Sequence, residues 1–554
     1  MARVPLRFAR ATVALEIAML AVAATPVPAS SAVARPNILV FLTDDQRTDS
    51  MDALPKTLEW FADAGTSFPN GLVTTPLCCP SRASILSGRY AHNTGVHTNS
   101  SVEEVYAFDQ SATVEAYLQA AGYRTAIAGK FLNLWNLQDT PPYWDHYAIM
   151  NQAYNNPKVN IDGDYTQHFG EYSTELVGEQ AIDFLDDFDH TDDAAPWFLY
   201  VTPFAPHAPY TASATYADSP IDTWAGNPAV FESDRSDKPT WVQTTVGTLA
   251  SANVVRTGQY RTLFSVDDVV DDVMTHLDEL GESNTLAIFM SDNGYTWSEH
   301  GINANKRVPY LPSVEVPFFV RWPGHVEEGA TDERIVAGID VAPTALDAAN
   351  VAEPDHPAMD GLSVLSGSSR SRILLEYWRS GDDVKWPSWS AELTSATQYI
   401  EWYDDDLQTI TFKEYYDLAN DPWQLVNLLD DGNGANDPDA KTLSKDLAVD
   451  RVCAASTCVD PIEPDTTAPT AVTGLAAAWD GDKVTLEWEP STDAVGVVAY
   501  RVFRNGVFLG RVGPAILTFE DATASPGETL TYKVRAKDRA GNRSPAGKVK
   551  ISIP

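Results

Sequence analysis

Four short apolar runs, separated by amphipathic stretches, dominate the first two thirds of the chain. They are N-I-L-V-F-L, Y-R-T-A-I-A, W-F-L-Y-V-T and T-L-A-I-F-M, and they begin at residues 37, 123, 197 and 285. Continuous apolar runs of this length are typical of strands buried on both faces of a parallel sheet. Helix-like stretches lie between them, at residues 111–121 and 265–280 for example. The alternation predicts an α/β domain with a large, mostly parallel sheet between helices over residues 35–365.

The pattern changes after residue 365. The segments S-R-I-L-L-E-Y-W, Q-Y-I-E-W-Y and T-I-T-F-K-E-Y-Y-D-L begin at residues 371, 398 and 409. They have the character of antiparallel strands, with D-D-D-L (404–407) as a turn between the last two. We therefore expect a smaller antiparallel sheet over residues 366–462, packed on the main domain.

A Pro- and Thr-rich linker at residues 461–470 precedes a third pattern. Segments 483–490, 498–510 and 531–538 alternate apolar and polar residues, and Arg504-Asn505-Gly506 is a hairpin turn signal. We expect a β-sandwich over residues 463–554, with Trp488, Tyr500 and Tyr532 as its core aromatics. This region resembles a fibronectin type III module.

The N-terminus has the pattern of an export signal. Arg3, Arg7 and Arg10 precede a mostly apolar stretch at 12–24, and Ala32-Val33-Ala34 offers a cleavage site. A membrane anchor would need a longer uncharged span than this one. We expect a signal peptide over residues 1–34, a secreted, extracellular protein and no stable membrane anchor.

The net charge of −39 is unevenly distributed along the chain. Residues 467–554 contain 11 Lys and Arg against 9 Asp and Glu, a net of +2, so the remainder carries −41. A body this acidic does not attract long polyanions, which argues against nucleic acid as a partner. An anionic substrate would have to be attracted by the site itself. Solubility, or life in salty surroundings, is the simpler explanation of the charge.

The four cysteines form two pairs of neighbours. Cys453 and Cys458 flank a short loop and are candidates for a disulfide in an oxidising compartment. Cys78 and Cys79 are adjacent, an arrangement in which a mutual disulfide is strained.

Polar side chains follow two of the predicted strands. Asp44 and Asp45 end the first apolar run, and Asp292 and Asn293 end the fourth. Ligands of open α/β sheets bind beyond the carboxyl ends of strands, and oxygen ligands suit a hard cation such as Ca²⁺ or Mg²⁺. Taken singly, each pair is more often a turn or a helix cap.

The run T-T-P-L-C-C-P-S-R-A-S-I-L-S-G-R-Y predicts a helix that begins near Cys78 and ends at Gly88. The free amides and positive dipole end of such an N-terminus favour an anion, and Arg82 adds a fixed cation. On these grounds alone Cys78 is a low-pKa thiolate or half of a disulfide.

The same run matches C-x-P-S-R-x-x-x-L-[ST]-G-[RK], so the chain resembles the formylglycine-dependent sulfatases. The resemblance implies an alkaline-phosphatase-like sulfatase fold and hydrolysis of sulfate esters of a sulfated sugar or glycan. It also implies that a formylglycine-generating enzyme oxidises Cys78 to an aldehyde. One hydroxyl of the hydrated aldehyde would attack sulfur and expel the alcohol, and the other would then lose a proton as sulfate leaves.

Further residues match the family in the expected order, and together the resemblance covers about residues 36–430. It implies that Asp44, Asp45, Asp292, Asn293 and the converted Cys78 bind calcium, with magnesium the less favoured ion. It places Lys130, in G-K-F-L-N, and Lys306 on the sulfate. It places His207, in A-P-H-A-P, on the side of the leaving oxygen, where it could donate a proton. Outside this set, His207 would be a loop histidine and Lys130 a solvated strand-end lysine.

One position departs from the general family pattern. Leu132, followed by Asn133, stands where many members have a histidine. The G-K-[FY]-L-N form is that of the N-acetylglucosamine-6-sulfatases and the extracellular heparan endosulfatases. We expect Asn133 and His300 to contact the substrate, with ordinary loop positions as the alternative. Trp297 is a candidate for a sugar pocket, and ordinary packing explains it equally well.

Two other functions remain open at this point. A phosphoester or phosphonate monoester hydrolase would share the fold, because both kinds of substrate are tetrahedral anions. A catalytically inactive, secreted glycan-binding protein would keep the scaffold and the C-terminal module, although the intact Cys78 and Arg82 argue against it.

Overall fold

The structure is a computed structural model that describes nine stretches of the chain. They are residues 35–192, 195–351, 358–379, 386–404, 409–458, 461–462, 467–493, 496–538 and 542–554. The predicted signal peptide at 1–34 and most of the predicted D-D-D-L turn lie outside these residues. Among the helices that are described, none combines the length and the apolar character needed to cross a bilayer.

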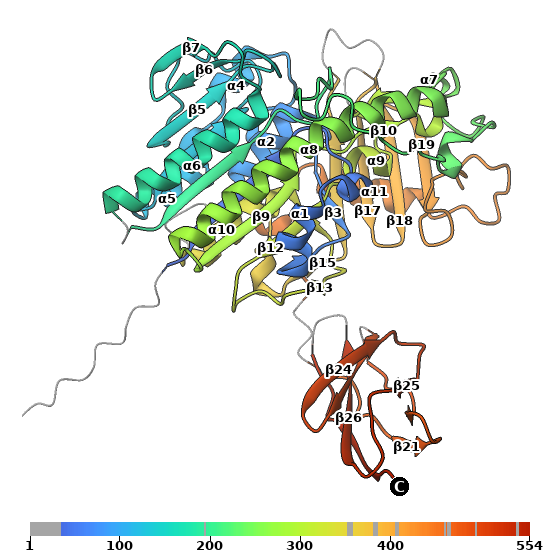
Figure 1. Cartoon of the computed structure of the whole chain (residues 1–554). Coiled ribbons are helices and arrows are strands. Elements are labelled where there is room, and N and C mark those ends of the chain that lie inside the picture. The colour runs from blue at the N-terminus through green and yellow to red at the C-terminus, as the bar shows by residue number, and fades with distance from the viewer. Residues whose placement is uncertain are drawn as a thin grey trace, which may run out of the picture. The chain divides into compact units, whose positions relative to one another are not determined.

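A ten-stranded mixed sheet forms the centre of the main domain, in the order β13-β2-β12-β9-β1-β8-β4-β5-β6-β7 (Figure 1). The four predicted runs are β1 (Asn37–Thr43), β4 (Arg124–Gly129), β8 (Trp197–Thr202) and β9 (Thr285–Ser291). They are neighbours and run parallel, which confirms the prediction. The other strands are β2 (Thr66–Ser67), β5 (His146–Met150), β6 (Lys158–Ile161), β7 (Asp164–Gln167), β12 (Phe318–Arg321) and β13 (Ala330–Thr331). Strands β12, β6 and β7 pair antiparallel to their neighbours.

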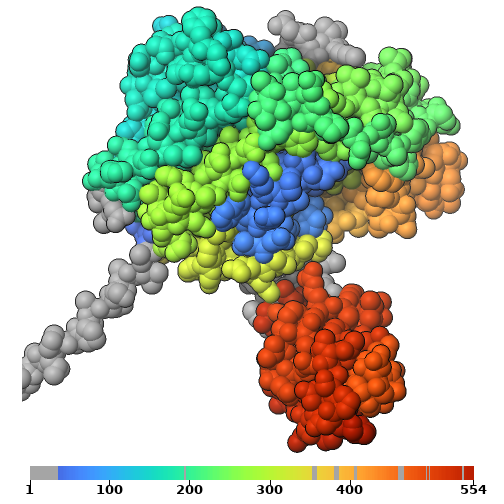
Figure 2. All heavy atoms as spheres, viewed as in Figure 1, coloured from blue at the N-terminus to red at the C-terminus, as the bar shows by residue number. Residues whose placement is uncertain are grey.

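Helices cover both faces of this sheet because its central strands are apolar on both sides. In β1, Leu39 and Phe41 belong to one core, while Ile38 and Val40 belong to the other. Helices α6 (Ser173–Asp192) and α8 (Leu249–Leu280) pack side by side on the first face, where their surfaces hide the strands (Figure 2). Helices α2 (Cys78–Ser87), α5 (Val114–Ala120) and α10 (Val341–Ala348) cover the second. Each large apolar side chain buried in this way stabilises the fold by about 1.5–3 kcal/mol.

The two predicted helices differ from the structure at their N-termini. The first begins as a 3₁₀ turn at Gln110–Ala112, and α5 starts only after Thr113. The second, α8, begins sixteen residues earlier than predicted, because Thr248 and Ser251 form a capping box that starts the helix at Leu249.

A separate four-stranded antiparallel sheet follows the main sheet in the chain, as predicted. Its strands pair in sequence order and are β16 (Arg372–Tyr377), β17 (Trp389–Thr394), β18 (Thr397–Tyr403) and β19 (Ile410–Asp417). Strand β17 was not predicted. Helix α11 (Ala440–Asp450) comes next, and Cys453 and Cys458 after it form a disulfide.

Short elements complete the main domain. They are α1 (Pro55–Leu58), α3 (Ala91–Thr94), α4 (Val102–Ala107), α7 (Thr240–Gln243), α9 (Leu311–Val314), β3 (Gly71–Leu72), β10 (Thr296–Trp297), β11 (Asn303–Asn305), β14 (Val336–Ala337), β15 (Ser369–Arg370) and β20 (Pro461–Ile462).

Residues 467–554 form two antiparallel sheets that share one core, which we call the C-terminal sandwich. Strands β21 (Ala476–Trp479), β22 (Val484–Glu487) and β25 (Thr518–Asp521) make one sheet. The other has the order β24-β23-β26-β27, with β23 (Val497–Arg504), β24 (Val507–Val512), β26 (Thr529–Asp538) and β27 (Gly547–Ser552). Trp488, Tyr500 and Tyr532 are buried in its core, as predicted. Strands β23 and β24 form a hairpin around Asn505 and Gly506.

Candidate active site

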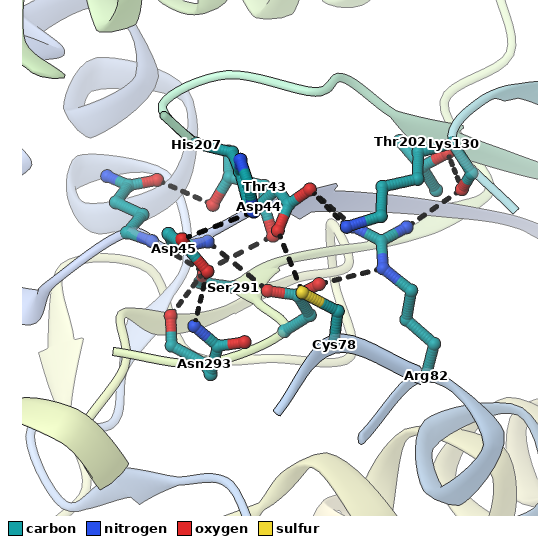
Figure 3. A network of polar contacts seen from close by, with 12 residues as sticks. Thr43, Asp44, Asp45, Cys78, Arg82, Lys130, Thr202, His207, Ser291 and Asn293 are labelled. Atoms are coloured by element: carbon teal, nitrogen blue, oxygen red, sulfur yellow. Dashed lines mark hydrogen bonds and ion pairs between the residues drawn. The ribbon is translucent and has the colours of Figure 1, made fainter. Parts of the chain in front are cut away.

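The carboxyl ends of β1 and β9 bring four polar side chains together (Figure 3). Thr43 and Ser291 are paired in register, so the residues that follow them meet. The Asp45 amide donates to Asp292 Oδ1 at 3.2 Å, and Asn293 Nδ2 donates to Asp45 Oδ1 at 2.7 Å. All four side chains, from Asp44, Asp45, Asp292 and Asn293, are buried. The two predicted pairs therefore form one cluster.

Helix α2 presents Cys78 to this cluster from its first turn. Leu77 before it has extended backbone angles, and Gly88 ends the helix with a φ of 67°, a left-handed conformation that glycine adopts without strain. Cys78 Sγ lies 3.5 Å from Asp44 Oδ1 and 2.7 Å from Lys306 Nζ. In the converted residue an aldehyde or diol oxygen would take the place of this sulfur.

The two adjacent cysteines have different surroundings. Burial raises the pKa of the Cys78 thiol, but Lys130 and Lys306 outweigh it and leave that pKa below its ordinary value. Burial raises the pKa of Cys79 to about 12, and its Sγ lies 3.8 Å from the Asn133 carbonyl oxygen. Cys78 therefore faces the charged cluster, while Cys79 packs in the core as a small apolar residue.

Three buried basic side chains surround the carboxylates. Arg82 Nε lies 2.7 Å from Asp292 Oδ2, and its Nη1 donates to the Lys130 carbonyl at 2.8 Å. Lys130 Nζ lies 2.5 Å from Asp44 Oδ2. Lys306 Nζ donates to Asp45. Although burial opposes ionisation, Lys130 and the other cations hold the pKa of Asp44 well below its ordinary value.

The local backbone explains how Lys130 reaches this position. It follows Gly129, whose φ is 121°, and a Cβ at residue 129 would lie 2.1 Å from the Thr202 carbonyl oxygen. Only glycine permits this close approach of β4 to β8. Thr202 Oγ1 then donates to the Lys130 carbonyl at 2.7 Å, which fixes the end of the strand.

His207 reaches the cluster from the loop after β8. Its Nδ1 lies 2.7 Å from the Ala208 carbonyl, an acceptor, so Nδ1 carries a proton and Nε2 faces Asp45 Oδ2 at 3.7 Å. Burial lowers the pKa of His207, but Asp45 and Asp44 outweigh burial and raise it to about 9. These carboxylates therefore favour the protonated ring.

The cluster fits a hard cation. Asn293 Oδ1 is buried and accepts no hydrogen bond within the described residues. Ligand atoms of Asp44, Asp45, Cys78 and His207 also lie within 4.8 Å of one another. Carboxylate and amide oxygens are the ligands that calcium and magnesium prefer.

Three predicted substrate contacts have other surroundings. Asn133 lies beside helix α2, where its carbonyl oxygen faces Cys79. His300 is buried, with Nδ1 2.7 Å from Glu232 Oε2 and its ring against Tyr310. Trp297 is 1% exposed and donates to Gln259, so packing explains it. Among the described residues, no hydrogen bond or ion pair joins Asn133 or His300 to the carboxylates of the cluster, and both remain predicted substrate contacts.

Two positioning residues were not predicted. Gln259 of α8 donates from Nε2 to the Asp45 carbonyl at 3.0 Å, and Ser291 Oγ accepts from the Gln46 amide at 3.0 Å. Nothing in the sequence distinguishes this glutamine from others inside helices, so its contact with Asp45 could not be predicted. Ser291, directly before Asp292, was visible only as part of a strand.

Comparisons with known proteins identify the family of the chain. The Sulfatase family profile matches residues 36–351, and the profile "N-sulphoglucosamine sulphohydrolase, C-terminal" matches residues 298–450. The human N-acetylglucosamine-6-sulfatase is 30% identical over 452 residues, which are 71% of this chain and 81% of that protein.

Two further matches differ in how much they cover. The Drosophila melanogaster extracellular sulfatase SULF-1 homolog is 33% identical over 362 residues, 62% of this chain, and the chain spans 32% of that relative's length. Among solved structures, BT4656 in complex with its substrate D-glucosamine-2-N,6-O-disulfate has a TM-score of 0.63 at 24% identity. That likeness covers 75% of this chain and 97% of the other, and it supports the fold.

Proposed function

The chain belongs to the sulfatase family, and on that premise we propose that it hydrolyses sulfate esters of sulfated sugars, with a formylglycine made from Cys78. The observation that carries the proposal is the place of Cys78 Sγ, at a helix N-terminus between Asp44 and Lys306. A nucleophile there faces buried cations that can hold a sulfate group while its charge shifts to the leaving oxygen.

The basic side chains have separate tasks in this proposal. The hydrated formylglycine at residue 78 would supply the hydroxyl nucleophile, and a bound calcium ion would supply a fixed positive charge. Lys130 and Lys306 neutralise sulfate oxygens, and both are anchored by carboxylates of the cluster. Arg82 Nη2 is buried and donates no hydrogen bond within the described residues, so it has a donor left for the sulfate.

His207 is the proposed proton donor to the leaving alcohol. Its Nδ1 donates a hydrogen bond to the Ala208 carbonyl oxygen, so Nε2 is the nitrogen that faces the site. The acidic neighbours that raise its pKa favour the protonated ring. A donor of this kind contributes about 10²–10⁴ in rate.

The substrate class rests on the relatives. A human relative is named N-acetylglucosamine-6-sulfatase, and BT4656 was solved with a glucosamine disulfate. We therefore propose a 6-sulfated amino sugar, or a glycan containing it, as the substrate. The proposal keeps Asn133 and His300 as substrate contacts.

The maturation of the chain belongs to the same proposal. Removal of residues 1–34, secretion, and oxidation of Cys78 by a formylglycine-generating enzyme would precede activity. We also propose calcium rather than magnesium, a sulfatase domain at 35–365 with its C-terminal subdomain at 366–462, and a fibronectin type III fold for the C-terminal sandwich.

The test combines mass spectrometry with a matched pair of variants. Peptide mass spectrometry across Thr74 to Arg82 should show an aldehyde at residue 78 in protein that has been co-expressed with a formylglycine-generating enzyme. Cys78→Ala should abolish sulfate release from N-acetylglucosamine-6-sulfate, while Cys79→Ala should retain it, because Cys79 packs away from the cluster. Unchanged sulfate release by Cys78→Ala would end the proposal. Faster turnover of the matched phosphate ester would reassign the enzyme.

A further inference from the structure

The C-terminal sandwich separates its charges between its two sheets. The four strands β24, β23, β26 and β27 carry eight Lys and Arg residues and a single acidic one, Asp538, which is buried. The other acidic residues of the sandwich lie on β22, on β25 or in loops. Although residues 467–554 have a net charge of only +2, one of the two sheets of the C-terminal sandwich is strongly basic.

The strand register collects seven of these basic residues on the outward face of that sheet. Arg501 of β23 lies opposite Arg511 of β24 on one side and opposite Arg535 of β26 on the other. Lys533 of β26 lies opposite Lys548 of β27. The remaining members are Lys537 and Lys550. Their strand neighbours, among them Val502, Tyr532 and Val534, point inward and are buried. We call these seven residues the basic face.

The arrangement is unfavourable for the fold itself. Like charges directly opposite on neighbouring strands destabilise a sheet, and here three arginines stand in one row across three strands. Arg504, the eighth basic residue, is paired with Asp521 at 2.9 Å, and within the basic face Arg501 and Lys537 share a single carboxylate, Glu327, at 3.5 Å each. Arg511, Arg535, Lys548 and Lys550 are exposed to solvent.

We propose that the basic face binds a linear sulfated polysaccharide. Neighbouring strands lie about 4.8 Å apart, so the arginine row offers cations at short, regular intervals along about 10 Å. Guanidinium groups bind the oxygens of tetrahedral anions with two parallel hydrogen bonds. Phe508, exposed beside the row with Arg501 over its ring at 4.8 Å, adds an apolar surface. The choice of a sulfated glycan over another polyanion rests on the proposed function.

The basic face would offset the repulsion between the acidic main domain and a polyanionic substrate. The chain outside residues 467–554 carries −41, which repels a polyanionic glycan. A tethered binding module raises the effective concentration of the polymer near the active site without a new contact there. The expected consequence is a lower KM for polymeric substrates and no change for a small sulfate ester.

The test is salt-gradient elution of the full-length protein from immobilised heparin. The variant Arg511→Gln/Arg535→Gln/Lys548→Gln should bind heparin about tenfold more weakly, with a shallower salt dependence. The control Lys158→Gln/Lys441→Gln/Lys445→Gln removes the same charge from exposed positions of the main domain and should elute with the wild type. Arg511→Lys/Arg535→Lys keeps the charge and should retain binding, which separates charge from folding.

Several outcomes would overturn the proposal. They are equal elution of the two triple variants, no retention of the wild type near physiological salt, and equally strong retention on double-stranded DNA. Turnover of a small sulfate ester is measured in parallel and should be the same in all variants. Its absence in the wild type would count against the proposed function, while heparin retention would still report on the basic face.

Discussion

Lys130 offers a sharp test of the proposed sulfate contacts of the site. Its ammonium lies 2.5 Å from Asp44 Oδ2, both groups are buried, and the residue lies outside the C-x-P-S-R run that surrounds Cys78. In Lys130→Met, an apolar side chain replaces the cation, and Asp44 keeps only its more distant basic neighbours.

Two losses are expected, and they have different sizes and readouts. Removing one partner of a buried ion pair costs about 3–5 kcal/mol of folding free energy. Removing one group that stabilises developing charge lowers kcat by about 10²–10³. We therefore expect Lys130→Met to lose two to three orders of magnitude in kcat/KM on N-acetylglucosamine-6-sulfate. The measured rates are normalised to the concentration of enzyme that is both folded and converted at Cys78.

The matched control is Arg370→Met. Arg370 is also buried and contacts Asp340 at 2.6 and 2.8 Å, but the pair stands apart from the carboxylates around Cys78. This variant should lose a similar amount of stability and keep its turnover per folded, converted molecule. If Lys130→Met turned over within about threefold of the wild type, Lys130 would be a structural counter-ion of Asp44 and the proposed sulfate contact would be wrong.

Two other predictions follow from buried polar groups. Calcium at 100 times its Kd should stabilise the wild type by about 2.7 kcal/mol and so raise its thermal unfolding midpoint. Asn293→Leu should show a smaller rise, because the substitution removes the buried Oδ1 that accepts no hydrogen bond within the described residues, and equal rises would argue against the metal site. Burial raises the pKa of Glu115 from 4.5 to about 8, so the folded state binds an extra proton and loses stability as the pH rises between these values. Glu115→Gln should therefore unfold at a higher temperature than the wild type at pH 8.5, with a smaller gain at pH 5.5; the same gain at both values would contradict the shift.

The local pattern of the chain was sufficient for much of the fold. The apolar runs that became β1, β4, β8 and β9 could be predicted because they are buried on both faces, where polar residues are too costly. Helix α2 could be predicted from Pro80 and Gly88, which act on the backbone nearby. Element boundaries were less predictable, since the start of α8 depends on the Thr248–Ser251 cap rather than on apolar periodicity.

The sequence by itself determined which residue types the site contains and in what order they occur. The motif around Cys78 identified the chemistry, and the strand ends identified the carboxylates. Only the tertiary structure decided which of the predicted residues meet: it joined Lys306 to Cys78 across 228 positions and placed His300 Nδ1 2.7 Å from Glu232 Oε2. The same holds for the basic face, whose members come from four strands and align only through strand register. The physical reason is that charges act through space over a few ångströms, and the distances between them are set by packing of elements far apart in sequence.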